Sequence, residues 1–224
     1  VIDCTFDIES SLKERIELIR EEAETAVRQG STFLVLSDKN ISNKKASIPS
    51  ILTVGAVHSH LVEHGLRGYC SLNVECSDAM DTHSFAILIG VGATTVNPYL
   101  AIDSIYQRFE KKLFGKSDFE TCVNKFKKSI DAGLLKIMSK MGISVISSYR
   151  GGCNFEAVGL SRAIVSDYFP GMSSRISGIG IIGIEKKIKE LHEKFNAKNV
   201  FTLPIGGLYS CLLYTSPSPR DVRS

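Results

Sequence analysis

The sequence predicts an α/β protein with a mainly parallel sheet and crossover helices, of a partial barrel-like kind. Short apolar runs alternate with longer segments of helical period, as at 11–29 followed by 32–36. Such alternation is typical of βαβ units. The run at 32–36 is unbroken, which favours a strand covered on both faces of a parallel sheet.

The first βαβ unit is the clearest. Residues 1–6 have the pattern of a strand, and apolar residues at 11–29 recur at spacings of three, four and seven. Ser11 and Glu14 form a capping-box signature at the start of this helix. The strand at 32–36 completes the unit.

The remaining elements follow in the same order. After a polar loop at 38–45, Ser47 is a candidate cap for a helix that runs to Gly65, and Gly133 marks a break in a later helix. The pattern predicts strands at 69–75 and 143–147 and helices at 83–89, 97–114, 118–141, 154–159, 161–169 and 182–195.

Composition narrows the functional class. The 224 residues suffice for one substantial domain, and 43% hydrophobic with 23% charged residues is ordinary for a globular core. The net charge is +3, and basic residues alternate with acids along the predicted helices, which argues against nucleic-acid binding. No apolar run reaches the roughly 18 residues of a membrane span, so we expect no membrane partner.

Cysteine usage and the chain start suggest a cytoplasmic protein cut from a longer one. The six cysteines have irregular spacing without a CxxC, which favours reduced thiols. There is no signal peptide, and the first residue, Val1, already has strand character. The chain therefore begins inside a larger protein on this reading.

Two groups of residues were weighed as metal sites. Cys70 and Cys76 share a strand face but lie about 20 Å apart at ~3.3 Å per residue, too far to ligate one cluster. His58, His60 and His64 fall on one helix without an HExxH motif. We expect His58 to be half-buried and the other two histidines to be exposed, rather than a metal site. We therefore assign no metal ligand.

Glycine-rich turns were weighed as phosphate sites. Gly178, Gly180 and Gly183 form a GxGxxG, but 172–176 is a poor strand to precede a dinucleotide loop. The Arg150-Gly151-Gly152 turn follows the predicted strand at 143–147, at a carboxyl end where α/β proteins collect functional groups. We favour a tight structural turn, in which Arg150 pairs with an acid such as Glu156, over a phosphate site.

Candidate nucleophiles and the C-terminal tail offer little chemistry. Cys153 follows two glycines at a helix start, where its thiol pKa could fall, but it lacks a defined base partner. Residues 210–224 are rich in Ser and Pro and have no period, so we expect a non-native or disordered tail. We assign no catalytic residue.

Several blocks, taken in order, resemble one family. They include LVLSD at 34–38, IPSILTVGAVHSHL at 48–61, VNPYLA at 96–101, SYRGGCNFEA at 148–157, SRISGIG at 174–180 and GGLY at 206–209. Together they resemble the central domain of the glutamate synthase large (alpha) subunit, more the bacterial NADPH-dependent type than the plastid ferredoxin type. The likeness covers residues 1–209, with the domain truncated at its N-terminus.

The resemblance implies a domain without a catalytic centre. Glutamate synthases release ammonia from glutamine, pass it through a tunnel, and reduce the imine formed with 2-oxoglutarate at FMN beside a 3Fe-4S cluster. The resemblance implies flanking amidotransferase and FMN domains, a small NADPH-oxidising subunit, and no cofactor bound by this segment. On this reading, Ser148, Tyr149, Arg150 and Glu156 are inter-domain or tunnel contacts. The alternative is a free-standing flavin- or phosphate-binding enzyme that uses the Arg150-Gly151-Gly152 turn.

Overall fold

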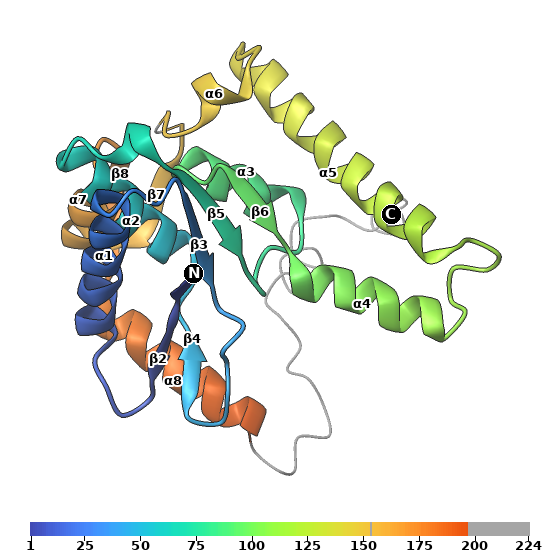
Figure 1. The fold of residues 1–224 in the computed structure, drawn as a ribbon, viewed down its shortest axis with the longest axis horizontal. Helices are drawn as coiled ribbons and strands as arrows, with labels where there is room; N and C mark the ends of the chain where they lie inside the picture. The colour runs from blue at the N-terminus through green and yellow to red at the C-terminus, as the bar shows by residue number, and fades with distance from the viewer. Residues whose placement is uncertain (153, 197–224) are drawn as a thin grey trace, which may run out of the picture.

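A four-stranded parallel sheet forms the centre of the fold (Figure 1). The computed structural model describes residues 1–152 and 154–196. The sheet has the order β1-β3-β5-β6, which is also the order along the chain. Sequential parallel strands linked by helices are the arrangement of an α/β barrel wall, and here the sheet does not close. The predicted fold class is therefore confirmed.

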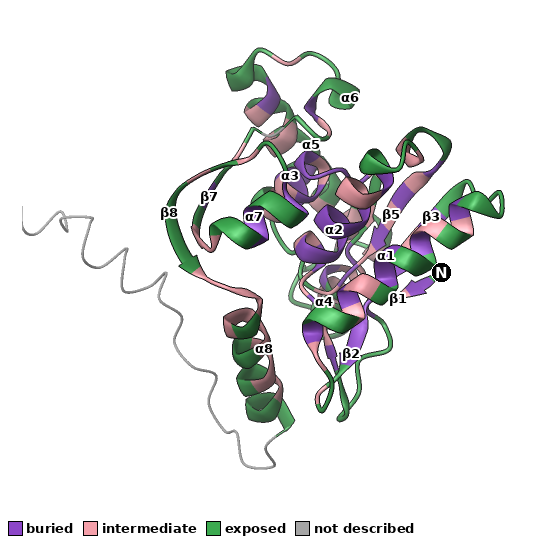
Figure 2. Ribbon diagram, turned by 90° about the vertical axis from the view of Figure 1, so that its left-hand side faces the viewer, coloured by how far each residue is buried: buried purple, intermediate pink, exposed green. Residues whose placement is uncertain are grey.

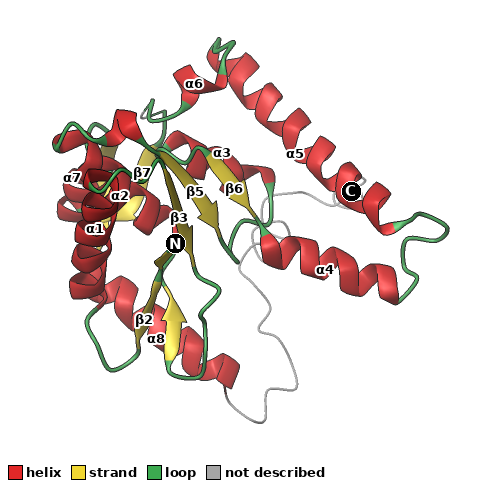
Figure 3. Ribbon diagram, viewed as in Figure 1, coloured by secondary structure: helices red, strands yellow, loops and turns green. Residues whose placement is uncertain are grey.

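The described strands are short, and helices hold most of the described residues (Figure 3). The strands are β1 (Ile2–Asp3), β2 (Thr5–Asp7), β3 (Phe33–Ser37), β4 (Lys45–Ser47), β5 (Ser71–Glu75), β6 (Thr95–Asn97), β7 (Glu156–Leu160) and β8 (Ser173–Ile179). The helices are α1 (Leu12–Arg28), α2 (Ser50–Glu63), the 3-10 turn η1 (Arg67–Tyr69), α3 (Thr82–Gly90), α4 (Tyr99–Glu110), α5 (Phe119–Met141), α6 (Ile146–Tyr149), α7 (Arg162–Tyr168) and α8 (Ile181–Asn196).

Among the described residues, helices cover only one face of the sheet. Leu34, Leu36, Leu72 and Val74 point into the core, where α1 and α2 pack. The alternate positions of β5 are polar and half-buried, and Figure 1 shows this side of the sheet without a helix in front of it. The expected cover on both faces was wrong. The run at 32–36 looked uniformly apolar because Phe33 and Val35 occupy the other face.

Helix α1 shows how the core is built. Its apolar stripe, which includes Leu12, Ile16, Ile19 and Ala23, is fully buried. Each of the larger side chains gains about 1.5–3 kcal/mol from leaving water. Burial differs between the described helices (Figure 2). Helix α2 is largely buried, whereas α8 is largely half-buried or exposed.

The strand predicted at 143–147 is absent. Helix α5 ends at Gly142, whose left-handed φ of 70° terminates it. The chain then turns directly into α6, and residues 144–148 are exposed. None of the four strands of the described parallel sheet pairs with this segment. The expectation that Tyr149 and Arg150 end a strand was therefore wrong.

The helix predicted at 154–159 is instead strand β7. It pairs in parallel with β8, the segment judged a poor strand, and α7 links the two. Two register shifts interrupt the ladder. Both strands contain glycine and many exposed side chains. They therefore lack the alternation of apolar and polar residues by which a strand is recognised in a sequence.

The predicted caps were partly wrong. Ser11 stands at the N-cap of α1 without a side-chain bond, and the first helical N–H, of Leu12, donates to Glu185 of α8 at 3.0 Å. Ser47 belongs to β4, and helix α2 begins at Ser50. Gly133 causes no break, because α5 is continuous there.

Several other elements were confirmed with both ends within one residue: α1, β3, α3, α5, α7 and α8. Strands β4 and β6, of three residues each, were missed. Within residues 1–152 and 154–196, no helix combines the length and apolar character needed to cross a membrane. Residues 197–224, with the predicted tail at 210–224, lie outside the described residues.

Candidate functional site

Tyr149 is a packing residue in this fold. Its side chain is 0% exposed and lies in a small cluster with Ala86 and Met138. The ring meets Phe155 edge-on, with centroids 6.2 Å apart. Burial raises the pKa of the phenol, and its hydroxyl finds no partner among the described residues. Tyr149 therefore anchors the segment whose neighbours, Ser148 and Arg150, are more accessible.

Arg150 lies at the amino edge of the sheet. Its Nη1 donates to Thr94 Oγ1 at 3.3 Å, and Thr94 directly precedes β6. The sequence had placed Arg150 at a carboxyl edge and had weighed an ion pair with Glu156. Instead, Glu156 lies 3.5 Å from Arg175 of the neighbouring strand β8.

A second guanidinium organises this edge. Arg67 of η1 donates to the carbonyl oxygens of Cys70 at 2.6 Å and Gly92 at 2.8 Å. Its Nε donates to His58 Nδ1 at 3.0 Å. Burial, together with the positive charges of Arg67 and Arg150, lowers the pKa of His58 to about 4. His58 is therefore neutral and accepts the hydrogen bond from Arg67. Its half-buried position agrees with the prediction from the sequence.

The glycine turn after Arg150 is used for packing. Gly151 adopts a left-handed φ of 70°, and its N–H donates to Gly90 at 2.9 Å. The N–H of Gly152 donates to Tyr149 at 3.2 Å. Both N–H groups that a phosphate would need already have protein acceptors. A cavity of about 180 Å³ beside Gly151 is lined mainly by apolar groups, including Val62 and Phe169.

The open face of the sheet carries a polar ladder that the sequence analysis missed. Asn73 and Glu75 of β5 stand opposite Thr95 and Asn97 of β6 in the parallel register. Thr95 Oγ1 donates to Asn73 Oδ1 at 2.6 Å, and Asn97 Nδ2 donates to Glu75 at 3.3 Å. Lys39 lies 2.7 Å from the same carboxylate. The alternation of Ser, Asn and Glu with Leu and Val in 71–75 was the available signal.

The carboxyl edge holds a buried carboxylate that was also missed. Asp38 is 3% exposed, and its Oδ2 accepts from Ser77 Oγ at 2.6 Å, Ser77 N at 3.0 Å and Ser47 Oγ at 3.0 Å. These bonds tie the ends of β3, β4 and β5 together. Burial and the nearby Asp38 raise the pKa of Tyr99. An Asp after one strand and Ser-Asp after the next indicated this convergence.

The described cysteines do not fit an iron–sulfur cluster. Cys70 and Cys76 are both buried and flank β5 at opposite ends, about 20 Å apart by strand geometry. Burial raises the pKa of the Cys76 thiol to about 12, so it remains protonated. They pack as small apolar residues, as predicted. Cys153 lies outside the described residues.

The GxGxxG also does not fit a dinucleotide. The predicted objection was wrong in part, because strand β8 precedes the motif and α8 follows it. The backbone of Gly159, however, occupies the space beside Gly178 that a cofactor would need. This close backbone approach explains the glycine.

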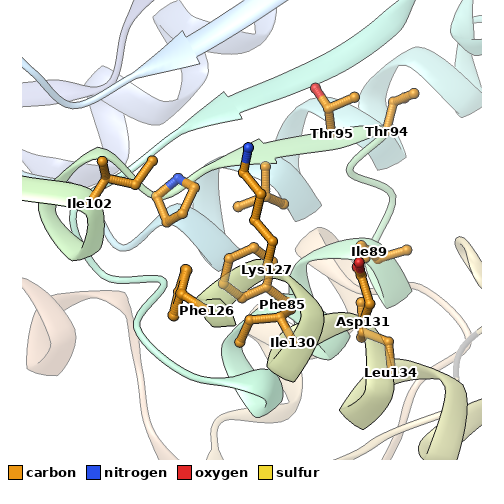
Figure 4. Close-up of a pocket in the computed structure, with 12 residues that line it drawn as sticks. Phe85, Ile89, Thr94, Thr95, Ile102, Phe126, Lys127, Ile130, Asp131 and Leu134 are labelled. Atoms are coloured by element: carbon orange, nitrogen blue, oxygen red, sulfur yellow. The ribbon is translucent and has the colours of Figure 1, made fainter. Parts of the chain in front are cut away.

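A separate apolar pocket of about 270 Å³ opens between α3, β6 and α5 (Figure 4). Phe85, Phe126 and Ile130 form its floor, and Lys127 extends across it from α5. Its lining lacks a nucleophile with a neighbouring base. The pocket offers packing surface rather than chemistry.

Fold and site together define a class: an α/β domain built on an open parallel sheet, with side chains at the sheet edges that hydrogen-bond to one another. A family model for the glutamate synthase central domain matches residues 1–161. The chain is 54% identical over 211 residues to the glutamate synthase [NADPH] large chain of Azospirillum brasilense, covering 93% of this chain and 14% of that protein.

Two further relatives agree. Identity is 42% over 197 residues to the glutamate synthase [NADPH] large chain of Bacillus subtilis, covering 86% of this chain and 12% of the relative. It is 42% over 188 residues to the chloroplastic ferredoxin-dependent glutamate synthase of Spinacia oleracea, covering 79% and 12%. The chain belongs to the glutamate synthase family, as part of its central domain. It spans about one seventh or less of the length of these relatives.

Proposed function

We propose that this segment is the frame between the two active sites of a glutamate synthase large chain. The whole enzyme makes glutamate from glutamine-derived ammonia and 2-oxoglutarate by reductive amination. Amidotransferase and FMN domains of the same chain flank the segment and carry the chemistry. FMN and a 3Fe-4S cluster belong to the whole subunit, since the described cysteines and glycines here do not fit them.

Exposed apolar side chains carry this proposal. Leu135 of α5 is 65% exposed, and Val145 and Ile146, just before Ser148, are 53% and 43% exposed. Val158 and Ile176 stand opposite each other on β7 and β8 and are 64% and 62% exposed. Such groups gain free energy when another domain covers them.

The candidate contacts follow from these positions. Ser148 adjoins the apolar residues of α6, and Glu156 begins β7, so both are placed to meet a neighbouring domain. Arg150 links the same segment to the sheet through Thr94. Tyr149 supports them from within the core. We assign Ser148, Arg150 and Glu156 to inter-domain contact on that basis, and give Tyr149 the supporting role.

The electron donor is proposed from the relatives. The NADPH-type chain of Azospirillum brasilense shares 54% identity with this segment, against 42% for the spinach ferredoxin form. The higher value favours NADPH, delivered through a small NADPH-oxidising subunit.

A flavin-binding measurement tests the frame against a free-standing flavin enzyme. The purified chain is mixed with FMN, separated from free flavin by gel filtration, and its visible spectrum is recorded. The frame predicts a colourless protein that forms no glutamate from glutamine and 2-oxoglutarate. A flavin band near one per chain that disappears in Arg150→Ala would establish the free-standing enzyme instead.

A further inference from the structure

Two histidines and a glutamate converge on the outer surface of helices α1 and α2. Glu24 belongs to α1, while His60 and His64 lie four residues apart on α2 and so share one helix face. One ligand atom of each lies within 4.8 Å of the others. Both histidines were predicted from the sequence to be exposed. The sequence alone does not place Glu24, which belongs to another helix, beside them.

The atoms that converge are metal ligands. His60 Nε2 lies 2.7 Å from Glu24 Oε2, and His64 Nε2 lies 3.9 Å from the same oxygen. Ligand atoms around a tetrahedral Zn²⁺ at 2.0–2.1 Å are separated by roughly 3.3 Å. Small side-chain rotations would therefore bring both nitrogens and the oxygen to coordination distance.

Supporting hydrogen bonds orient two of the three side chains. His64 Nδ1 lies 2.8 Å from the carbonyl oxygen of His60, so it carries a proton and leaves Nε2 as the lone-pair donor in the neutral ring. Arg28 binds Glu24 Oε1 at 2.8 Å and leaves Oε2 directed at the histidines. Such second-shell contacts are typical of protein metal sites.

The side chains are also accessible without being fully solvated. Their exposed fractions are 22% for Glu24, 18% for His60 and 38% for His64. Partial burial holds the rotamers, and the opening at His64 gives an ion and its remaining water ligands a path in.

We propose that Glu24, His60 and His64 form a site for a divalent transition metal of the Zn²⁺ class. Two imidazoles and one carboxylate are a known zinc donor set, with water completing the shell. The bound ion would replace the hydrogen bond between His60 and Glu24 and connect α1 to α2. Its role is to clamp these two helices.

Titration of the tag-free, metal-free chain with Co²⁺ tests the site. We expect one Co²⁺ per chain, a visible ligand-field band, and a melting temperature that rises with Co²⁺ concentration. His64→Ala should weaken Co²⁺ binding by at least about tenfold. His83→Ala, which alters an exposed histidine on α3, should bind as the parent does.

A second variant guards against a folding artefact. Glu24→Gln keeps the side-chain length and removes the charge, and circular dichroism checks that each variant is folded. Weakened Co²⁺ binding in both Glu24→Gln and His64→Ala supports the site. Unchanged affinity in either folded variant, or no saturable binding by the parent chain, overturns it.

Discussion

The Nε of Arg67 lies 3.0 Å from Nδ1 of His58 and donates a hydrogen bond to it. This contact joins the turn before β5 to the buried side of α2. Because the imidazole accepts this bond and faces two guanidinium groups, protonation would break the hydrogen bond and add a third positive charge. The neutral form of His58 therefore stabilises the amino edge of the sheet.

The first prediction concerns acid sensitivity. The pKa of His58 falls from 6.5 in the unfolded chain to about 4 in the fold. Its stabilising contribution is therefore complete above pH 6.5 and is lost as the pH falls towards 4. We expect about 1 to 2 kcal/mol of stability to disappear by pH 5, after allowance for partial solvation.

Urea unfolding at pH 5 and pH 8 measures this loss. In His58→Gln, whose amide oxygen can still accept from Arg67, the difference in unfolding free energy between the two pH values should shrink. His83→Gln is the matched control, since His83 is exposed on α3. An equal pH dependence in the parent and His58→Gln would show that His58 does not govern it.

The second prediction concerns the geometry of Arg67. A lysine keeps the charge but cannot reach His58, Cys70 and Gly92 together, because it lacks the planar fork. Arg67→Lys should cost about 1–3 kcal/mol of unfolding free energy by leaving acceptors unpaired. Arg175→Lys, at an 84% exposed side chain, should change it little. Similar losses in the two variants would contradict this role.

The third prediction concerns the buried carboxylate at the carboxyl edge. Asp38→Ala strands the N–H and hydroxyl of Ser77 and the hydroxyl of Ser47. A loss of about 1–3 kcal/mol is expected from chemical denaturation, with a smaller loss for Asp38→Asn, which retains an acceptor oxygen. Asp103→Ala on the exposed side of α4 serves as the control. Stability unchanged in Asp38→Ala would mean that solvent replaces these bonds.

The fourth prediction concerns Gly55 inside α2. Glycine to alanine inside a helix ordinarily stabilises by about 1 kcal/mol. Here the added Cβ would overlap the ring of Phe169 and approach the carbonyl oxygen of Tyr168 at 2.8 Å. Overpacking of this kind costs about 1–3 kcal/mol, so Gly55→Ala should lower the melting temperature. Gly68→Ala meets no atom within 4 Å and should leave it unchanged or raise it; a rise in Gly55→Ala would contradict the packing of α7 on α2.

The sequence predicted elements whose own residues determine them. Helix α1 was predicted almost to the residue because its apolar stripe recurs over 17 positions. Strands β7 and β8 were not recognised, because they depend on each other across α7 and carry glycines in place of a clear period. The strand predicted at 143–147 failed for the converse reason, since no described strand pairs with this apolar run and its last residues enter helix α6.

The candidate sites divide in the same way. Arg150 was predicted to be a site residue because it is polar and follows a predicted strand. Its side chain does make a polar contact, with Thr94, but the predicted strand is absent. Asp38 and Ser77 become a site only when β3 and β5 pair, 39 residues apart. The Glu24 and His60 contact likewise spans 36 residues. Single-sequence patterns reveal residues within one element and cannot place two elements side by side.

The central claim is that this segment couples two active sites without performing chemistry. It is tested most directly by the ratio of glutamine hydrolysed to 2-oxoglutarate consumed, which is one when the two reactions are coupled, in a full-length large chain that carries the segment. Arg150→Ala, compared with the exposed α4 variant Arg108→Ala, should raise this ratio above one while FMN content and ammonia-supported glutamate formation stay at the parent level. Loss of ammonia-supported synthesis in Arg150→Ala, with the ratio unchanged, would contradict the account.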